Sequence, residues 1–250
     1  MSFVTLSRDR EIATLTLQRG KVNALNDEVI GELREKLSQI ESDESLRGAV
    51  LTGKGSFFSF GFDIPGFLSY SREEFTKYLE AFSSLYAYLF LFPKPVIAAL
   101  NGHAVAGGCM IATACDYRLM VTGKAKISLN EINFGSSVFA GSVAMLKHWV
   151  GGWNAERILY SGKMYGAEEA LDLGLIDRVV SGEDLPGEAL SVAKDLAQKE
   201  SAAFRSIKNL IRAPVAEEMS RREKDSIREF VCIWYSENTW KKVRMIRITS

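Results

Sequence analysis

The sequence has few histidines, few cysteines and no long hydrophobic run, and each shortage argues against a class of protein. His103 and His148 have no cysteine or carboxylate companion at ligand spacing, so the sequence predicts no metal site. Cys109, Cys115 and Cys232 form neither a C-x-x-C pair nor a disulfide framework, and we expect buried thiols in a reducing compartment. The longest apolar runs, such as VIAAL and CMIATAC, are far shorter than the roughly 20 residues that span a bilayer, so we expect no membrane partner.

An excess of charge of either sign is also absent. Among the 250 residues, 31 are basic and 31 are acidic, so nothing in the charge balance favours binding to nucleic acid. The first residues, MSFVTLSRDREIATLTL, lack the basic-then-apolar pattern of a secretory signal, and we expect a cytoplasmic protein. Hydrophobic residues make up 47% of the chain, which is ordinary for a globular protein with a sizeable core.

The chain does contain an alternation of strand and helix patterns in its first part. FVTLS and IATLTL, separated by the polar RDRE, predict a hairpin, whereas AVLTG and PVIAAL predict short buried strands. A helix capped by Asn26 or Asp27 and a second helix over residues 72–92 lie between these strands. This order predicts an α/β fold built from stacked β-β-α units.

Helical patterns dominate from about Asn154 onward. The segment after Pro214 combines charge pairs at four-residue spacing with large apolar side chains, including Phe230, Trp234 and Trp240. Such a helix needs a partner surface, which is either its own domain or another subunit.

Two glycine-containing loops each follow a short strand. In FFSFGFDIPGF, Gly61 either forms a simple tight turn or bends the chain so that the following backbone N–H groups point into a cleft. In NGHAVAGGCMIATACDYR, Gly107 and Gly108 form either a structural turn or a helix N-terminus with free N–H groups. One N–H from each loop could bind a single oxygen, which would make an oxyanion hole.

Glu131, within KISLNEINFG, is the candidate base. Its neighbours Leu129, Ile132 and Phe134 are apolar, and an apolar setting raises the pKa of a carboxyl group. The alternative is an exposed glutamate in a turn. A base with a pKa near neutrality beside an oxyanion hole is what removal of a proton next to a carbonyl requires.

These three segments together resemble the crotonase superfamily, the group of enoyl-CoA hydratases and isomerases. FSFGFDI is similar to the family's first oxyanion segment, KPVIAALNGHAVAGGCMIATACDYRL to its second and SLNEINFG to its catalytic loop, in the expected order. The resemblance implies that Phe62 and Gly107 supply the two N–H donors and that Glu131 is catalytic. It also implies a spiral of repeated β-β-α units over residues 1–190, with the acyl-CoA site, and a helical trimerisation region over residues 191–250.

Met110 departs from the hydratase pattern. Hydratases carry one glutamate directly after the GGC triplet and another in the later loop, whereas here the first position is Met110 and only Glu131 remains. Hydration shares its proton transfers between two carboxylates, but one base is enough to move a double bond. The pattern is therefore similar to the mitochondrial-type Δ3,Δ2-enoyl-CoA isomerases, which also have an apolar residue at this position.

The resemblance implies an enzyme that isomerises 3-enoyl-CoA to 2-enoyl-CoA, as a homotrimer or a dimer of trimers. No separate cofactor is expected, because coenzyme A is part of the substrate. Phe60, Ile64, Met110 and Phe139 are expected to line the substrate pocket. Two alternatives stay open: a hydratase or other acyl-CoA enzyme that uses one glutamate, and a non-catalytic acyl-CoA-binding scaffold.

Overall fold

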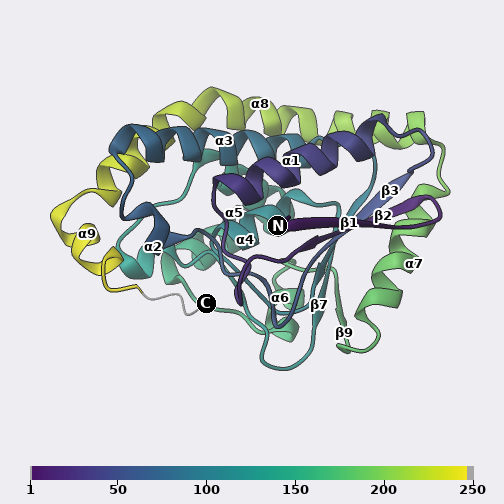
Figure 1. Ribbon diagram of the computed structural model, residues 1–250, viewed down its shortest axis with the longest axis horizontal. Helices are drawn as coiled ribbons and strands as arrows, with labels where there is room; N and C mark the ends of the chain where they lie inside the picture. The colour runs from purple at the N-terminus through teal and green to yellow at the C-terminus, as the bar shows by residue number, and fades with distance from the viewer. Residues whose placement is uncertain (1, 247–250) are drawn as a thin grey trace.

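The computed structural model describes residues 2–246, which form two β-sheets surrounded by helices (Figure 1). The larger sheet has six strands in the order β1-β2-β3-β5-β7-β9, and the smaller sheet has three strands in the order β4-β6-β8. The strands of the larger sheet are β1 (Val4–Asp9), β2 (Ile12–Leu17), β3 (Gly48–Gly53), β5 (Val96–Leu100), β7 (Tyr117–Val121) and β9 (Arg178–Val180). Those of the smaller sheet are β4 (Phe57–Ser59), β6 (His103–Val105) and β8 (Ile127–Ser128).

Each repeat of the fold contributes one strand to each sheet and then a helix. β3 and β4 are followed by the short α2 (Ile64–Phe67) and by α3 (Arg72–Phe90), and β5 and β6 are followed by α4 (Gly107–Ala114). β7 and β8 are followed by η1 (Glu131–Phe134) and α5 (Ala140–Ser161). Neighbouring strands are parallel except in the hairpin of β1 and β2. The predicted α/β architecture of repeated β-β-α units is confirmed.

The two early helices each begin after a residue whose side chain caps the helix. α1 (Asp27–Ser42) begins after Asn26, whose side chain accepts a hydrogen bond from the Val29 N–H. α3 begins after Ser71, which forms a reciprocal capping box with Glu74. The apolar positions that repeat with helical spacing in α1 are buried: Val29, Leu33, Leu37 and Ile40.

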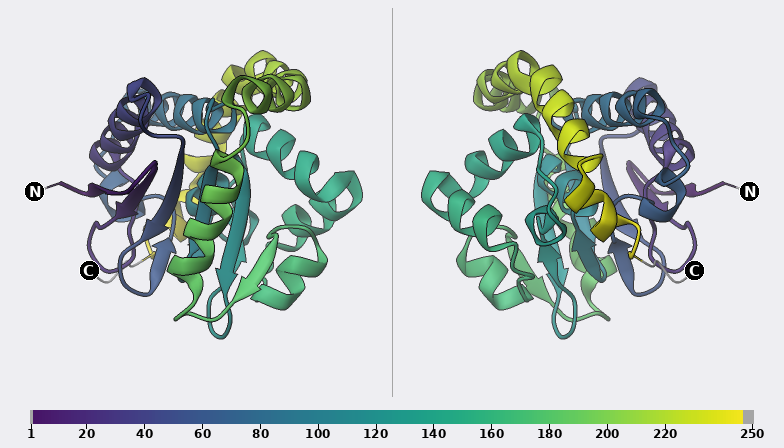
Figure 2. Two further views of the ribbon diagram at one scale, coloured as in Figure 1. Left: turned by 90° about the vertical axis from the view of Figure 1, so that its right-hand side faces the viewer. Right: turned by 90° about the vertical axis from the view of Figure 1, so that its left-hand side faces the viewer.

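The C-terminal part is built around one long helix, α8 (Ser201–Trp234), followed by α9 (Glu237–Val243). α8 lies alongside α3 and also contacts α5 (Figures 1 and 2). It begins well before Pro214 and continues through it, although proline cannot donate the helical hydrogen bond. The sequence pattern after Pro214 therefore marks only the second half of this helix.

α7 (Leu185–Ala197) joins the core to the C-terminal helices and packs against β3 and β5. The predicted boundary after residue 190 falls within α7, so the two predicted regions share this helix. α6 (Ala167–Asp172) and β9 precede it, and β9 was missed because it has only 3 residues. Residues 247–250 of the predicted helical region lie outside the described residues.

Two composition-based expectations can be compared with the described residues. Cys109 and Cys115 are buried as expected, but Cys232 is exposed because it lies on a solvent-facing side of α8. Within residues 2–246, no helix has both the length and the apolar content needed to cross a bilayer.

Candidate active site

The smaller sheet brings the three predicted functional segments to one edge. β4, β6 and β8 are parallel neighbours, and the carboxyl ends of parallel strands meet at the same edge of a sheet. Residues 60–63 follow β4, residues 106–108 follow β6 and residues 129–134 follow β8. Strand pairing therefore places segments that are distant in the sequence next to one another.

The first segment is held by hydrogen bonds to Leu25. The Leu25 N–H donates to the Gly61 carbonyl at 2.8 Å, and the Asp63 N–H donates to the Leu25 carbonyl at 3.0 Å. The Gly61 N–H donates to the Ser59 hydroxyl at 3.2 Å, and Gly61 has a φ of +89°, which favours glycine. None of these bonds uses the Phe62 N–H, which donates to no described residue and is left available.

The second segment opens α4 and touches the first. Gly107 is the first residue of the helix, and its N–H donates to no described residue. Ala106, directly before it, has a φ of +50°, a strained conformation for a residue with a β-carbon. A β-carbon on Gly107 would lie 2.9 Å from the Phe62 ring, and one on Gly108 would lie 2.3 Å from the Ser59 carbonyl oxygen. The glycine pair is therefore required by close contact with the first segment.

Glu131 is the first residue of the short 3-10 helix η1, which is separated from the end of β8 by two residues. Its side chain is buried, with 4% of the residue exposed, and neither carboxylate oxygen accepts a hydrogen bond from another described residue. Burial away from water raises the pKa of Glu131 to about 8. This position agrees with the predicted apolar setting and not with an exposed turn.

Distant elements hold the loop that carries Glu131. The Thr239 hydroxyl on α9 donates to the Gly135 carbonyl at 2.6 Å, and the Asn133 side-chain amide donates to the Gly162 carbonyl at 2.7 Å. Gly135 ends η1 in a left-handed conformation with a φ of +84°. The position of Glu131 thus depends on the C-terminal helix α9 and on the end of α5.

A cavity of about 290 Å³, which we call the front cavity, lies against these segments. Five predicted site residues line it together: Phe60, Phe62, Ile64, Glu131 and Phe139. Gly107 is not part of the lining, but the preceding Ala106 is. Another cavity, of about 840 Å³, lies between the ends of α1, α3 and α7 and the start of α8, and it contains none of the predicted site residues.

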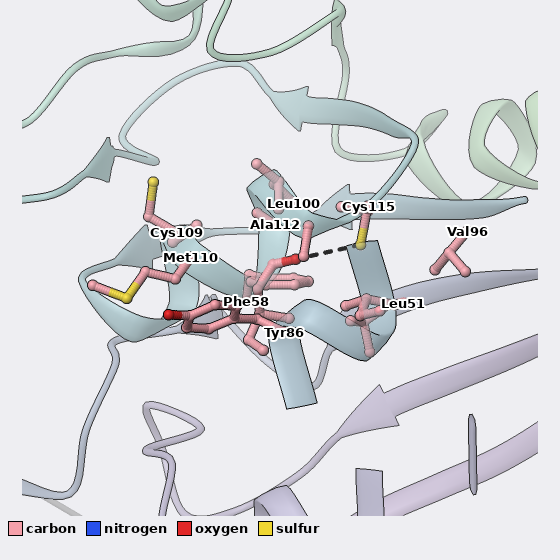
Figure 3. Close-up of a cluster of buried hydrophobic side chains, with 14 of the residues drawn as sticks. Leu51, Phe58, Tyr86, Val96, Leu100, Cys109, Met110, Ala112 and Cys115 are labelled. Carbon is pink, nitrogen blue, oxygen red and sulfur yellow. Dashed lines mark hydrogen bonds between the residues drawn. The ribbon is translucent and has the colours of Figure 1, made fainter. Parts of the chain in front are cut away.

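Met110 does not line the front cavity. It is 1% exposed, and Figure 3 shows it in a cluster of buried side chains that includes Phe58, Tyr86 and Cys109. Every residue of α4 is buried, so a side chain on its first turn is enclosed by the core. The expectation that Met110 forms a wall of the pocket is corrected accordingly.

The C-terminal region supplies a wall that the sequence analysis did not assign to the site. Phe230 and Trp234 of α8 line the front cavity together with Ile246. The Phe230 ring lies 4.6 Å from the Phe139 ring, and the Trp234 ring lies 6.4 Å from the Phe134 ring. The apolar pattern after Pro214 did signal a covered surface. The surface that this segment covers is the front cavity of the same chain.

Known proteins share this fold. Residues 7–238 match the family model described as enoyl-CoA hydratase/isomerase. A probable enoyl-CoA hydratase of Bacillus subtilis is 36% identical over 200 residues, which cover 80% of this chain and 76% of the relative. The mitochondrial enoyl-CoA delta isomerase 1 of Mus musculus is 28% identical over 236 residues, which cover 94% of this chain and 82% of the relative. The crystal structure of human mitochondrial delta3-delta2-enoyl-CoA isomerase matches with a TM-score of 0.91 at 28% identity, covering 97% of this chain and 96% of that one.

The fold and the site define a crotonase-type enzyme of acyl-CoA metabolism. The chain belongs to the enoyl-CoA hydratase/isomerase family.

Proposed function

We propose that the protein shifts the double bond of 3-enoyl-CoA thioesters to give 2-enoyl-CoA thioesters, with Glu131 as both base and acid. The observation that carries this proposal is that Glu131 is the only ionisable side chain among the described residues lining the front cavity. The similarity to the mouse and human mitochondrial isomerases, which extends over nearly the whole chain, supports it.

The reaction removes one proton from C2 of the substrate and adds one proton to C4. Ionised Glu131 takes a proton from C2, and the electron pair of that C–H bond forms a dienolate with its negative charge on the thioester oxygen. The N–H groups of Phe62 and Gly107 stabilise this oxygen, since neither is used within the described chain. Protonated Glu131 then gives a proton to C4, and the remaining double bond lies between C2 and C3.

The absence of a second ionisable group from the lining favours isomerisation over hydration. Adding water needs one group that activates the water and one that protonates carbon. The position that holds a glutamate in hydratases is Met110 here, and its side chain is enclosed in the core. Isomerisation needs only the proton transfers that a single carboxyl group performs.

The variant Glu131→Gln tests the assignment, because it keeps the shape of the side chain and removes the base. Isomerase turnover should fall by about 10²–10⁴-fold, as expected for loss of a general acid–base group. The measurement uses a series of 3-enoyl-CoA thioesters of different lengths, with circular dichroism as the check that the variant is folded. Turnover close to that of the unmodified protein would remove Glu131 from this role.

The names of several relatives favour a second candidate function, hydration of 2-enoyl-CoA. These relatives include the Bacillus subtilis protein and a short-chain-enoyl-CoA hydratase of Clostridium acetobutylicum. The two activities are compared on one preparation, with 3-enoyl and 2-enoyl thioesters of equal length. Faster hydration than isomerisation would replace the proposal. Exchange of C2 protons with deuterated water would exclude a scaffold that only binds acyl-CoA.

A further inference from the structure

A second cavity of about 340 Å³, which we call the back cavity, also reaches Glu131. It lies against α5, which changes direction at Gly151, where φ is +73° and ψ is 165°. Val143 lines it from the first half of α5, and Ala155 lines it from the second half. Glu131 is the only described residue that lines both the front and the back cavity.

The inner end of the back cavity contains two buried polar side chains without partners. The Ser136 hydroxyl and both carboxylate oxygens of Glu131 form no hydrogen bond with a described residue, although the two residues are only 7% and 4% exposed. Their backbones are joined, because the Ser136 N–H donates to the Glu131 carbonyl at 3.0 Å. A buried hydroxyl and a buried carboxyl group are stabilised by hydrogen-bonding partners, and water is the smallest such partner.

The outer end of the back cavity is at the protein surface. Lys147, Glu156 and Tyr160 line it, and all three side chains are exposed. The rest of the lining is mostly apolar and includes Leu129 and Val143. The back cavity therefore extends from Glu131 to solvent without passing through the front cavity.

We propose that the back cavity is a water-filled route through which Glu131 exchanges its proton with solvent while the acyl chain occupies the front cavity. In this exchange the Glu131 carboxyl group releases one proton to water, and the resulting carboxylate accepts one proton from water. Ser136 is a positioning residue that holds the water next to Glu131. This inference rests on the proposed function, in which Glu131 carries the transferred proton.

Such a route answers a requirement of the proposed reaction. An acyl chain in the front cavity displaces water from the one side of Glu131 that the substrate occupies. A base that is protonated in most molecules near neutral pH must lose that proton before it can take one from C2. The back cavity lets the proton leave after the substrate has bound.

The test is isomerisation of a 3-enoyl-CoA thioester in deuterated water, with the deuterium at C4 of the early product measured by mass spectrometry. In the unmodified protein we expect most product molecules to carry solvent deuterium. Val143→Phe and Ala155→Met each fill the back cavity and should lower the deuterated fraction by about fivefold, because transfer through water needs an unbroken path. Ser136→Ala should lower it as well, with little change in KM.

Ile64→Phe is the matched control, because it adds bulk to the front cavity instead. It should lower kcat/KM for isomerisation and leave the deuterated fraction of the product unchanged.

Three results would overturn the proposal: no deuterium in the product of the unmodified protein, an unchanged fraction in the filled variants, or a KM that rises with acyl length in Val143→Phe, which would make the cavity an acyl site. If the protein does not isomerise 3-enoyl thioesters, the same variants are compared by deuterium exchange at C2 of a saturated acyl-CoA. That exchange separates failure of the route from failure of the isomerase assignment.

Discussion

Glu131 shows how burial prepares a carboxyl group for proton transfer. A carboxylate without hydrogen-bonding partners is less stable in the protein interior than in water, so its pKa rises. A higher pKa makes the ionised form a stronger base toward a weakly acidic C–H bond. The same shift makes the ionised form the minority at pH 7. Burial therefore makes the Glu131 carboxylate a stronger base but lowers the fraction of molecules in which Glu131 is ionised.

Isomerase activity should rise with pH through the pKa of Glu131. Because the group acts as a base and its pKa is raised to about 8, kcat/KM should increase with pH below that value and level off above it. The increase should approach about tenfold per pH unit well below the pKa. The measurement is kcat/KM for one 3-enoyl-CoA thioester between about pH 6 and about pH 9.5 at constant ionic strength. A flat profile would show that the base is ionised throughout this range, against the buried position described here.

At the scale of elements, the segments that follow β4 and β6 depend on glycine because the two segments are in direct contact. Gly108 lies against the Ser59 carbonyl and Gly107 lies against the Phe62 ring, so neither position has space for a β-carbon. Both segments follow strands of the smaller sheet. The spacing of the two N–H donors is therefore set by strand pairing and by close backbone contact together.

Gly108→Ala should destabilise the protein and lower turnover together. The added methyl group meets a backbone oxygen, which cannot move as a flexible side chain can, and we expect a loss of about 1–3 kcal/mol in the free energy of unfolding. Gly31→Ala on α1 is the control, because nothing lies within 4 Å of its added β-carbon. That variant should be neutral or more stable by up to about 1 kcal/mol. Urea denaturation of both variants makes the comparison, and equal stabilities would contradict the contact.

Buried charges hold α8 against the core. Lys208 and Arg212 lie 2.9 and 3.0 Å from the Asp116 carboxylate, and Arg212 also donates to the Phe90 carbonyl at 2.8 Å. Burial lowers the pKa of both Lys208 and Arg212. These contacts lie within two turns before Pro214, and together with packing on α3 and α5 they offset the hydrogen bond that proline cannot make.

Asp116→Asn should strongly destabilise the packing of α8 against the core. It leaves two buried cations without their anion, and such a loss typically costs about 3–5 kcal/mol. Asp225→Asn makes the same chemical change in an exposed ion pair with Arg228, where the effect should be below about 1 kcal/mol. The two free energies of unfolding are measured under identical conditions. Similar small losses in both variants would mean that the buried pair does not hold the helix.

At the scale of the whole molecule, the apolar surface of α8 divides into a covered and an uncovered part. Phe230 and Trp234 are buried by the same chain, whereas Ile207, Leu210 and Ile211 are 59%, 75% and 55% exposed. These three positions share one face of the helix by their spacing. We propose that this face contributes to a homotrimer or a dimer of trimers, with the interface before Pro214 instead of in the aromatic segment after it.

Leu210→Asp should shift the assembly toward monomers, because it places a charge at the centre of the exposed apolar face. Light scattering at micromolar concentration should give the mass of three or six chains for the unmodified protein and a lower mass for the variant. Leu171→Asp, at a position on α6 that is 38% exposed, serves as the control and should keep the full mass. A stable monomer before any substitution would contradict the proposed assembly.

The sequence by itself determined the features whose signals are local. The side-chain cap at Asn26 marks a helix start because it satisfies an N–H group three residues away. The hairpin of β1 and β2 follows from alternating patterns on either side of a short polar turn. The apolar residues near Glu131 predicted its burial, although the adjacent Ile132 is itself 47% exposed.

Only the tertiary structure decided which of these features meet. The pairing of β4, β6 and β8 brings the segments that contain Phe62, Gly107 and Glu131 to one edge of the smaller sheet, although no local pattern connects them. The enclosure of Met110 in the core and the placement of Trp234 over the front cavity also depend on elements far away in the chain. The physical reason is that burial and strand pairing are summed over the whole folded chain, whereas periodicity and capping act within a few residues.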